Sequence, residues 1–401
     1  MLSYDDALSS VLAAAIPLPL EDVPLAEAFG RALAEDVVAR ENLPPFDNSS
    51  VDGYAVRLSD TDHAAPAAPV RLHRGETIAA GHPPTRALQN GEAAPIFTGA
   101  PLPDGADAVV MVEDSDTDGN DTIILRDPGF ASFIRRTGSD IKIGEIALRA
   151  GSLLDSGSIG LLSALNVTTV SGASRPRVAL LTTGDEIVPA GTGPLPPGKI
   201  RDANGPALAA ALLEAGALVT HRLHVADNAE AVRSALLSAS ENCDVIIASG
   251  GVSVGEFDYV KTIAGELGTL NFWRIAIKPG KPLAFGKIGR ALFFGLPGNP
   301  VSSLVTFELF VRPALRRMAG YTDQTRPLVS ARLTEALSHQ PGRREFVRAR
   351  LFWLGDTYHA TPLGAQGSHR LASIAGAEAY LIAHEDHGDY NAGAKLPAFL
   401  I

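Results

Sequence analysis

Hydrophobic residues recur with different spacings in different regions of this chain, and each spacing predicts a kind of element. Residues 3–16 have the spacing of an amphipathic helix, with Ser3 as its N-cap and two aspartates in its first turn. A second helix is predicted over residues 25–39. The two prolines at positions 44 and 45 then predict an extended loop over residues 42–50.

Short β-like runs separated by Gly, Pro and Asp dominate residues 51–138. The runs cover residues 70–73, 94–97, 108–112 and 122–125. Such a pattern predicts a small β-rich domain. A helix over residues 156–165 and a strand over residues 168–170 follow. We expect these pieces to pack with the N-terminal helices, which makes the β-rich domain an insertion.

Apolar strands and helices alternate between residues 177 and 320. The predicted strands cover residues 177–182, 217–225, 244–249, 272–277, 283–286 and 291–295. The predicted helices are 204–214 with Asn204 as cap, a helix through residue 238 with Asp227 as cap, 257–267, and a long helix from Asn299 to Met318 that bends at Pro313. This alternation predicts a mostly parallel sheet with helices on both faces.

The C-terminal region has β-like runs at residues 329–333, 345–351 and 379–383, which predict a small β domain or barrel. The fold class is therefore multidomain α/β plus β. Residues 1–47 and 139–175 are expected to form a discontinuous, mixed N-terminal linker domain, and 48–138 the β-rich insertion. Residues 176–320 are expected to form the α/β domain and 321–401 the C-terminal domain.

Charge and composition exclude several functions. The chain has 34 basic and 45 acidic residues, a net charge of −11, which argues against a general nucleic-acid binder. Its single cysteine, Cys243, excludes an intrachain disulfide or a cysteine metal site. We expect no membrane span, because no run of about 18 apolar residues occurs. The acidic N-terminus does not have the basic start of a signal peptide, so a cytoplasmic location is expected.

One loop organises the candidate chemistry. An apolar strand ends at Ser249, and Gly250, Gly251, Ser253 and Gly255 follow it before a predicted helix. The free N–H groups of such a turn bind phosphate or another oxyanion. Two carboxylates in the same turn, Glu256 and Asp258, suggest a metal-bridged anion. An ordinary βα turn with acids that favour the helix dipole is the alternative at this point.

Three more polar loops follow strands of the predicted sheet. They carry Asp185 and Glu186, then Lys278 and Lys281, and then the run Pro297, Gly298, Asn299 and Ser302. The carboxyl ends of parallel strands share one edge, so the loops are expected to converge on one crevice. Cations, N–H donors and acids together suit a phosphorylated substrate with a divalent cation. An ordinary turn is the alternative for each loop alone and the simpler one for residues 183–186, but four such loops at one sheet edge favour a binding site.

Polar clusters also occur around the inserted domain. Asp52 and Thr98 lie in Gly-rich and Pro-rich turns, where ligand binding and simple turn capping are both open. Asp140 lies at the return from the insertion, beside Arg135 and Arg136, where a surface ion pair is the simpler interpretation.

Taken together, these loops resemble the MoeA family of molybdopterin molybdenumtransferases, whose eukaryotic relative is the E domain of gephyrin. The matching runs are residues 46–56, 96–101, 138–140, 183–186, 249–256, 277–282 and 295–302, with 366–370 more weakly. Val51, where relatives often carry Met, departs from the pattern, and the C-terminal domain matches least.

The resemblance implies a reaction and an assembly. Molybdate would be inserted into molybdopterin-adenylate with release of AMP, assisted by Mg²⁺ or a similar divalent cation. The α/β domain would be MogA-like, similar to the adenylyltransferase that makes this substrate, and contact with that enzyme is possible. The family is an elongated homodimer, with the insertion of one subunit facing the α/β crevice of the other.

The resemblance also implies residue roles. The cation would be held by acids, namely Asp185, Glu186, Asp227, Glu256 and Asp258. The substrates would be bound by Ser249, Gly250, Gly251, Ser253, Gly255, Pro297, Gly298, Asn299, Ser302, Arg348 and Ser368. The expected catalytic residues are Asp52, Thr98, Asp140, Glu186, Asp258, Lys278 and Lys281.

Two other functions remain open from the sequence. A molybdopterin adenylyltransferase would use the same α/β domain, although it would not need the flanking domains. A pure scaffold that binds a partner peptide would not need the acids and lysines.

Overall fold

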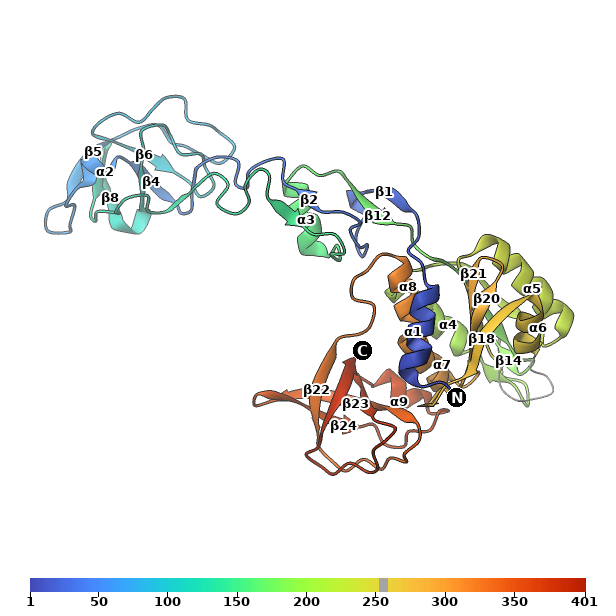
Figure 1. Cartoon of the computed structure of the whole chain (residues 1–401). Helices are drawn as coiled ribbons and strands as arrows, with labels where there is room; N and C mark the ends of the chain where they lie inside the picture. Colours follow the sequence, from blue (N-terminus) through green and yellow to red (C-terminus); the bar gives the residue numbers. More distant parts are fainter. Residues whose placement is uncertain (252–258) are drawn as a thin grey trace.

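The computed structural model describes residues 1–251 and 259–401. The molecule is elongated, with the β-rich insertion at one end and the α/β unit at the other, joined by a narrow linker (Figure 1). The C-terminal domain lies beside the α/β unit (Figure 1). Among the described helices, none is long and apolar enough to cross a membrane.

The α/β unit is built on one mixed sheet with the order β16-β13-β17-β21-β20-β18. The strands are β13 (Arg177–Thr183), β16 (Leu218–Val225), β17 (Val245–Ser249), β18 (Gly268–Arg274), β20 (Pro282–Ile288) and β21 (Ala291–Leu296). Strands β16, β13, β17 and β21 run parallel, and only β20 runs against its neighbours β21 and β18. The predicted mostly parallel sheet is therefore confirmed.

Helices cover both faces of this sheet, as the alternating pattern predicted. They are α1 (Tyr4–Ala14), α4 (Asn204–Glu214), α5 (Ala229–Asn242), α6 (Tyr259–Leu267), α7 (Pro300–Thr306) and α8 (Arg312–Met318). Strand β17 is buried throughout. Val245 and Ile247 pack with α1, α4, α7 and α8, whereas Ile246 and Ala248 pack with α5 and α6.

The predicted ends of several elements differ from the structure. The first residue of β18 is Gly268, and Ile277 belongs to a separate short strand, β19 (Ile277–Lys278). Asp227 is not the cap of α5, because Asn228 accepts the hydrogen bond from the Ala231 N–H instead. The long helix is interrupted by a π-helical turn over Phe307–Val311, followed by Arg312 and then Pro313, whose missing N–H cannot continue the α-helical ladder.

The linker contains the clearest wrong prediction. Residues 25–39 do not form a helix: a 3-10 turn over Leu25–Glu27 is followed by irregular chain and the short strand β2 (Val37–Val38). Gly30 adopts a left-handed φ of 74°, and its N–H bonds to the Leu154 carbonyl. Pairing with residues 152–154 and 171–172 thus replaces the helical hydrogen bonds. The predicted helix α3 (Ser156–Ala164) is confirmed.

The rest of the linker is made of short paired strands. These are β1 (Leu20–Pro24) with β12 (Thr169–Ala173), β2 with β11 (Ile146–Leu148), and β3 (Asn48–Ser49) with β10 (Ile134–Arg135). Segments from both sides of the insertion therefore lie together. Helix α1 does not join them: Tyr4 packs on Phe310 and Phe346, with ring centroids 5.6 and 5.3 Å away.

The insertion is β-rich, as predicted, with the strand order β7-β4-β6-β5-β9-β8. Its elements are β4 (Gly53–Val56), α2 (Leu58–Thr61), β5 (Val70–Arg74), β6 (Glu92–Ile96), β7 (Ala108–Met111), a 3-10 turn (Val112–Asp114), β8 (Ser115–Asp118) and β9 (Asp121–Ile124).

The C-terminal region closes into a barrel. Its elements are β22 (Leu328–Leu333), β23 (Arg344–Leu354), β24 (Thr357–Pro362), α9 (Leu371–Ala375), β25 (Ala379–Ala383) and β26 (Lys395–Leu400). The order β23-β24-β22-β26-β25 closes because β25 pairs again with β23. Strand β19 from the α/β unit adds to this sheet beside β23.

Candidate functional site

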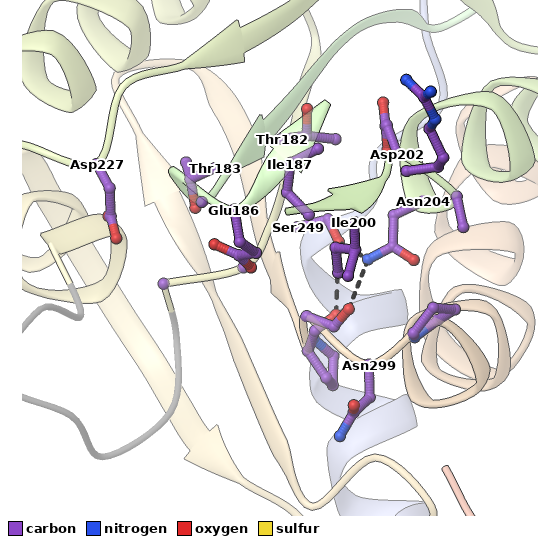
Figure 2. A pocket seen from close by; sticks show the side chains of 18 of the residues that line it. Thr182, Thr183, Glu186, Ile187, Ile200, Asp202, Asn204, Asp227, Ser249 and Asn299 are labelled. Carbon is purple, nitrogen blue, oxygen red and sulfur yellow. Dashed lines mark hydrogen bonds between the residues drawn. The ribbon is translucent and has the colours of Figure 1, made fainter. Parts of the chain in front are cut away.

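A polar pocket of about 480 Å³ lies where the parallel strands of the α/β sheet end (Figure 2). Strand register explains its position. Thr182 on β13 pairs with Ser249 on β17, and Ser249 pairs with Leu296 on β21. The chain therefore leaves three adjacent strands at the same level, and the loops that follow surround one space, as expected for an open α/β sheet.

Many of the predicted residues line this pocket. They are Glu186, Asp227, Ser249, Gly250, Gly251, Pro297, Gly298 and Asn299. The lysine loop contributes Pro282. Predicted residues Ser253, Gly255, Glu256 and Asp258 lie outside the described part of the chain, so their placement stays a prediction.

Glycine is required where two of the loops meet. Gly250 has a φ of 101°, which side chains rarely adopt, and a Cβ there would lie 2.8 Å from the Thr183 hydroxyl oxygen. The loop after β17 is thus packed directly on the end of β13. Because glycine has no side chain, the backbone of this loop can also approach a ligand closely.

A segment of the connection between β13 and α4, missed from the sequence, completes the wall. Strands β14 (Ile187–Val188) and β15 (Ile200–Arg201) pair next to the pocket and bring Arg201, Asp202 and Asn204 to it. The Asp202 carboxylate accepts from the Gly205 N–H at 2.8 Å at the start of α4. An aspartate ahead of a helix was a usable signal, but no apolar strand precedes this loop.

The sequence predicted Asn204 as a helix cap, but the structure shows a different role. It is the first residue of α4, and its amide nitrogen donates to the Ser249 hydroxyl and to the Gly298 carbonyl, both at 2.8 Å (Figure 2). One side chain therefore ties the end of β17 to the loop before α7.

Two acids from different strand ends line the pocket. Glu186 follows β13 and Asp227 follows β16 (Figure 2). Asp185 is exposed and does not line it. Among the described residues, three or more potential metal ligands do not come together. Two carboxylates nevertheless fit Mg²⁺, which is usually held by one or two carboxylates together with substrate phosphates.

The lysine loop lies beside the pocket, between the α/β unit and the barrel. Gly280 has a φ of 105°, and a Cβ there would lie 2.4 Å from the Thr306 methyl carbon, so the loop packs tightly on α7. The same helix carries buried Ser302. Lys278 pairs with Glu345 of β23, Nζ to Oε1 2.9 Å, whereas Lys281 is exposed.

Arg348 of the barrel is fully buried, although it carries a charge. Its Nε donates to the Ser373 hydroxyl at 2.8 Å and its Nη2 to the Gly367 carbonyl at 3.3 Å. Its Nη1 has no hydrogen-bond partner within the described ranges. Burial lowers the pKa of this guanidinium. A buried cation with an unused donor suits an anion, and Ser368 lies half-buried in the adjoining loop.

The other predicted catalytic residues lie elsewhere in the same chain. Asp52 and Thr98 are exposed on the insertion and bonded to each other, and Asp140 is exposed where the chain re-enters the linker. Figure 1 shows this end of the molecule well separated from the α/β sheet. The structure therefore does not bring these three residues to the pocket of their own chain.

Comparison with known protein families covers almost the whole chain. The model described as MoeA N-terminal region (domain I and II) matches residues 2–166, and the probable molybdopterin binding domain matches residues 179–317. The MoeA C-terminal region (domain IV) matches residues 330–401.

Individual relatives agree with these matches. The chain is 37% identical to the molybdopterin molybdenumtransferase of Haemophilus influenzae, over 98% of this chain and 97% of the relative. It is 40% identical to molybdopterin molybdenumtransferase 2 of Mycobacterium tuberculosis, over 93% of each chain. The crystal structure of the molybdopterin biosynthesis MoeA protein from Pyrococcus horikoshii OT3 superposes with a TM-score of 0.84, at 30% identity and full coverage of both chains. With its sequence, its fold and its pocket in agreement, the chain belongs to the MoeA family of molybdopterin molybdenumtransferases.

Proposed function

We propose that this protein inserts molybdate into molybdopterin-adenylate and releases AMP, with the help of a divalent cation. The observation that carries the proposal is the convergence of four strand-end loops, after β13, β16, β17 and β21, on one polar pocket, with glycine backbone, three carboxylates and a helix start around it. Such a pocket can hold a phosphorylated ligand through N–H groups and a bridging cation.

Molybdate would bind beside this pocket, at the boundary with the barrel. Molybdate is a tetrahedral dianion, and the described residues nearby offer Lys278, Lys281, the Ser302 hydroxyl and the unpartnered Arg348 Nη1. Ser368 adds a further hydroxyl. The dithiolene sulfurs that receive the metal belong to the substrate, so the protein needs no cysteine ligand.

Mg²⁺ or a similar cation would be held by Glu186 and Asp227, together with the substrate phosphates. Asp185, Glu256 and Asp258 stay in this proposal as predicted ligands. The cation would screen the phosphate charge and stabilise the charge that develops on the departing phosphate. The residues of the chain then have to bind and orient the two substrates.

A dimer would explain why Asp52, Thr98 and Asp140 lie far from the pocket of their own chain. We infer that the protein acts as a homodimer in which Asp52, Thr98 and Asp140 of one copy reach the pocket of the other. The separation of these residues from the pocket within one chain supports this inference (Figure 1). A cytoplasmic location and contact with the molybdopterin adenylyltransferase belong to the same proposal.

AMP release tests the reaction. Purified protein is given molybdopterin-adenylate and Mg²⁺ with or without molybdate, and AMP is quantified. AMP that depends on both molybdate and the cation supports the proposal. Adenylylation of free molybdopterin by ATP would instead identify an adenylyltransferase. Lys281→Ala and Asp227→Asn variants that fold but keep full activity would favour a scaffold.

A further inference from the structure

A buried histidine lies behind the lysine loop, in the barrel. His339 has a side chain only 1% exposed, and Glu345, next to it on β23, is 4% exposed. Its Nδ1 lies 3.1 Å from Glu345 Oε2, and its Nε2 lies 3.1 Å from the His384 carbonyl oxygen. The remaining oxygen of Glu345 accepts from Lys278. A continuous chain of contacts thus connects the barrel interior with the proposed molybdate site.

The partners of His339 decide where protons must be. A carbonyl oxygen can only accept, so Nε2 has to carry a hydrogen. Nδ1 faces a carboxylate oxygen, so a second proton has to lie between His339 and Glu345. A further carboxylate beside His339, that of Asp389, is already engaged by the His339 backbone N–H at 2.8 Å and by the Ser338 hydroxyl at 3.0 Å. The additional proton therefore compensates the charge of Glu345.

This compensation matters for Lys278. A buried, uncompensated carboxylate 2.9 Å from the ammonium would cancel its charge and repel a dianion at the same place. With the proton held by His339, the cluster of Lys278, Glu345 and His339 keeps a net charge of +1. Lys278 is then oriented by Glu345 and still attracts an anion.

We propose that His339 is a positioning residue for the molybdate site: it neutralises Glu345, so that Glu345 can orient Lys278 without removing its positive charge. The inference rests on the proposed role of the lysine loop in binding molybdate. It assigns the barrel a part in substrate binding that reaches the crevice through a side chain buried inside the barrel.

The test uses a neutral replacement that keeps the hydrogen bond to Glu345. In His339→Gln, the amide NH₂ can still donate to Glu345, but the side chain carries no charge. Titration calorimetry of the full-length protein with molybdate alone should show affinity reduced about tenfold, because the cluster of Lys278, Glu345 and His339 loses one unit of positive charge. In steady-state assays the KM for molybdate should rise, while the KM for molybdopterin-adenylate stays unchanged.

A second substitution separates charge from structure. Glu345→Gln in the His339→Gln background removes the uncompensated carboxylate, and the Gln oxygen still accepts from Lys278. Molybdate affinity should return to within about twofold of the wild type. A purely structural pair would instead give weaker binding in the double variant, and that result would overturn the proposal, as would wild-type affinity in His339→Gln.

Glu385→Gln is the matched control. Glu385 accepts from Arg344, the residue before Glu345 on β23, at 2.8 Å, and within residues 1–251 and 259–401 no ion pair joins Glu385 to Lys278. This variant should bind molybdate like the wild type. If the variants show the expected molybdate affinities but the wild type releases no AMP, the proposed reaction alone is refuted. If the wild type releases AMP but His339→Gln binds molybdate as tightly as the wild type, the role of His339 alone is refuted.

Discussion

Thr98 donates both its backbone N–H and its hydroxyl to one oxygen of Asp52, at 2.7 and 2.9 Å. The backbone hydrogen bond, followed by the hydroxyl, holds the pKa of Asp52 below its ordinary value. Asp52 is thus kept ionised and in a fixed orientation on an exposed surface of the insertion. An exposed carboxylate held in this way is suited to a ligand that arrives from outside its own chain.

Complementation between two inactive variants tests whether the site is shared. Asp52→Ala and Lys281→Ala homodimers should each be inactive, because every site lacks one group. Subunits exchanged at random between the two should recover about a quarter of the wild-type activity, since half of the dimers then contain one intact site. Activity measured after co-expression and after mixing checks this, and a complete failure to recover would place all residues of the site in one chain.

Asn204→Ala should weaken binding of molybdopterin-adenylate. The substitution removes the hydrogen bonds to Ser249 and Gly298, at a cost of about 1–2 kcal/mol in the free energy of unfolding. The KM for this substrate should rise, while the KM for molybdate changes little. Asn228→Ala is the control, because it removes a helix cap of about 1 kcal/mol outside the pocket. Equal KM values in both variants would contradict a role for Asn204 in the pocket.

Gly280→Ala should destabilise the protein more than the same substitution at another glycine with a left-handed φ. The new Cβ would lie 2.4 Å from the Thr306 methyl carbon, so overpacking adds about 1–3 kcal/mol to the conformational cost. Gly289→Ala is the matched control: its φ is 57°, but the nearest atom lies at 3.8 Å. In urea unfolding, the free energy of unfolding of Gly280→Ala should be lower than that of Gly289→Ala. The reverse order would show that the lysine loop moves away from α7 freely.

The junction between linker and insertion should be sensitive to acid. Asp47 accepts from the Thr137 N–H, which lowers its pKa; burial opposes this shift, and Arg136 and the Thr137 hydroxyl add to it. Because the folded-state pKa is depressed, the stabilisation is complete above the ordinary aspartate pKa of about 3.9 and is lost as the pH falls through the folded value.

Asp47→Asn should therefore lower the unfolding free energy by about 1 kcal/mol at neutral pH, since the pair is partly exposed. The difference from the wild type should shrink toward pH 3. Urea unfolding at several pH values measures it, and exposed Asp104 supplies the control substitution. A difference that grows on acidification would reverse the assigned sign.

Much of the fold and of the pocket was predictable because local patterns decide them. The central strand β17 is an apolar run buried on both faces, and the loop after it had to lie at the carboxyl edge of the sheet. The helix predicted over residues 25–39 was wrong because the spacing of its apolar residues carries no information about the partners of Gly30, which lie beyond residue 150. The role of residues 201–204 in the pocket wall was missed for a related reason, since β15 pairs with the short strand β14 and no long apolar strand ends directly before these residues.

The resemblance implied that Arg348 and Ser368 of the barrel bind substrate, but the attachment of the barrel to the lysine loop was out of reach from the sequence. Strand β19 pairs with β23 across a long stretch of chain, and no periodicity in either segment predicts that pairing. The buried contact of His339 with Glu345 was not predicted either, because neither residue stands in a motif that indicates it.

The attachment of β19 to the barrel has a consequence for cells. Lys278, which we propose binds molybdate, is carried on a strand whose neighbour is the barrel strand β23, so a substitution that disturbs the barrel should lower the affinity for molybdate. Affinity defects are offset by ligand concentration, whereas loss of a reacting group is not. In cells, cofactor synthesis impaired by barrel substitutions should then recover when molybdate is added to the medium, and synthesis impaired by pocket substitutions should not.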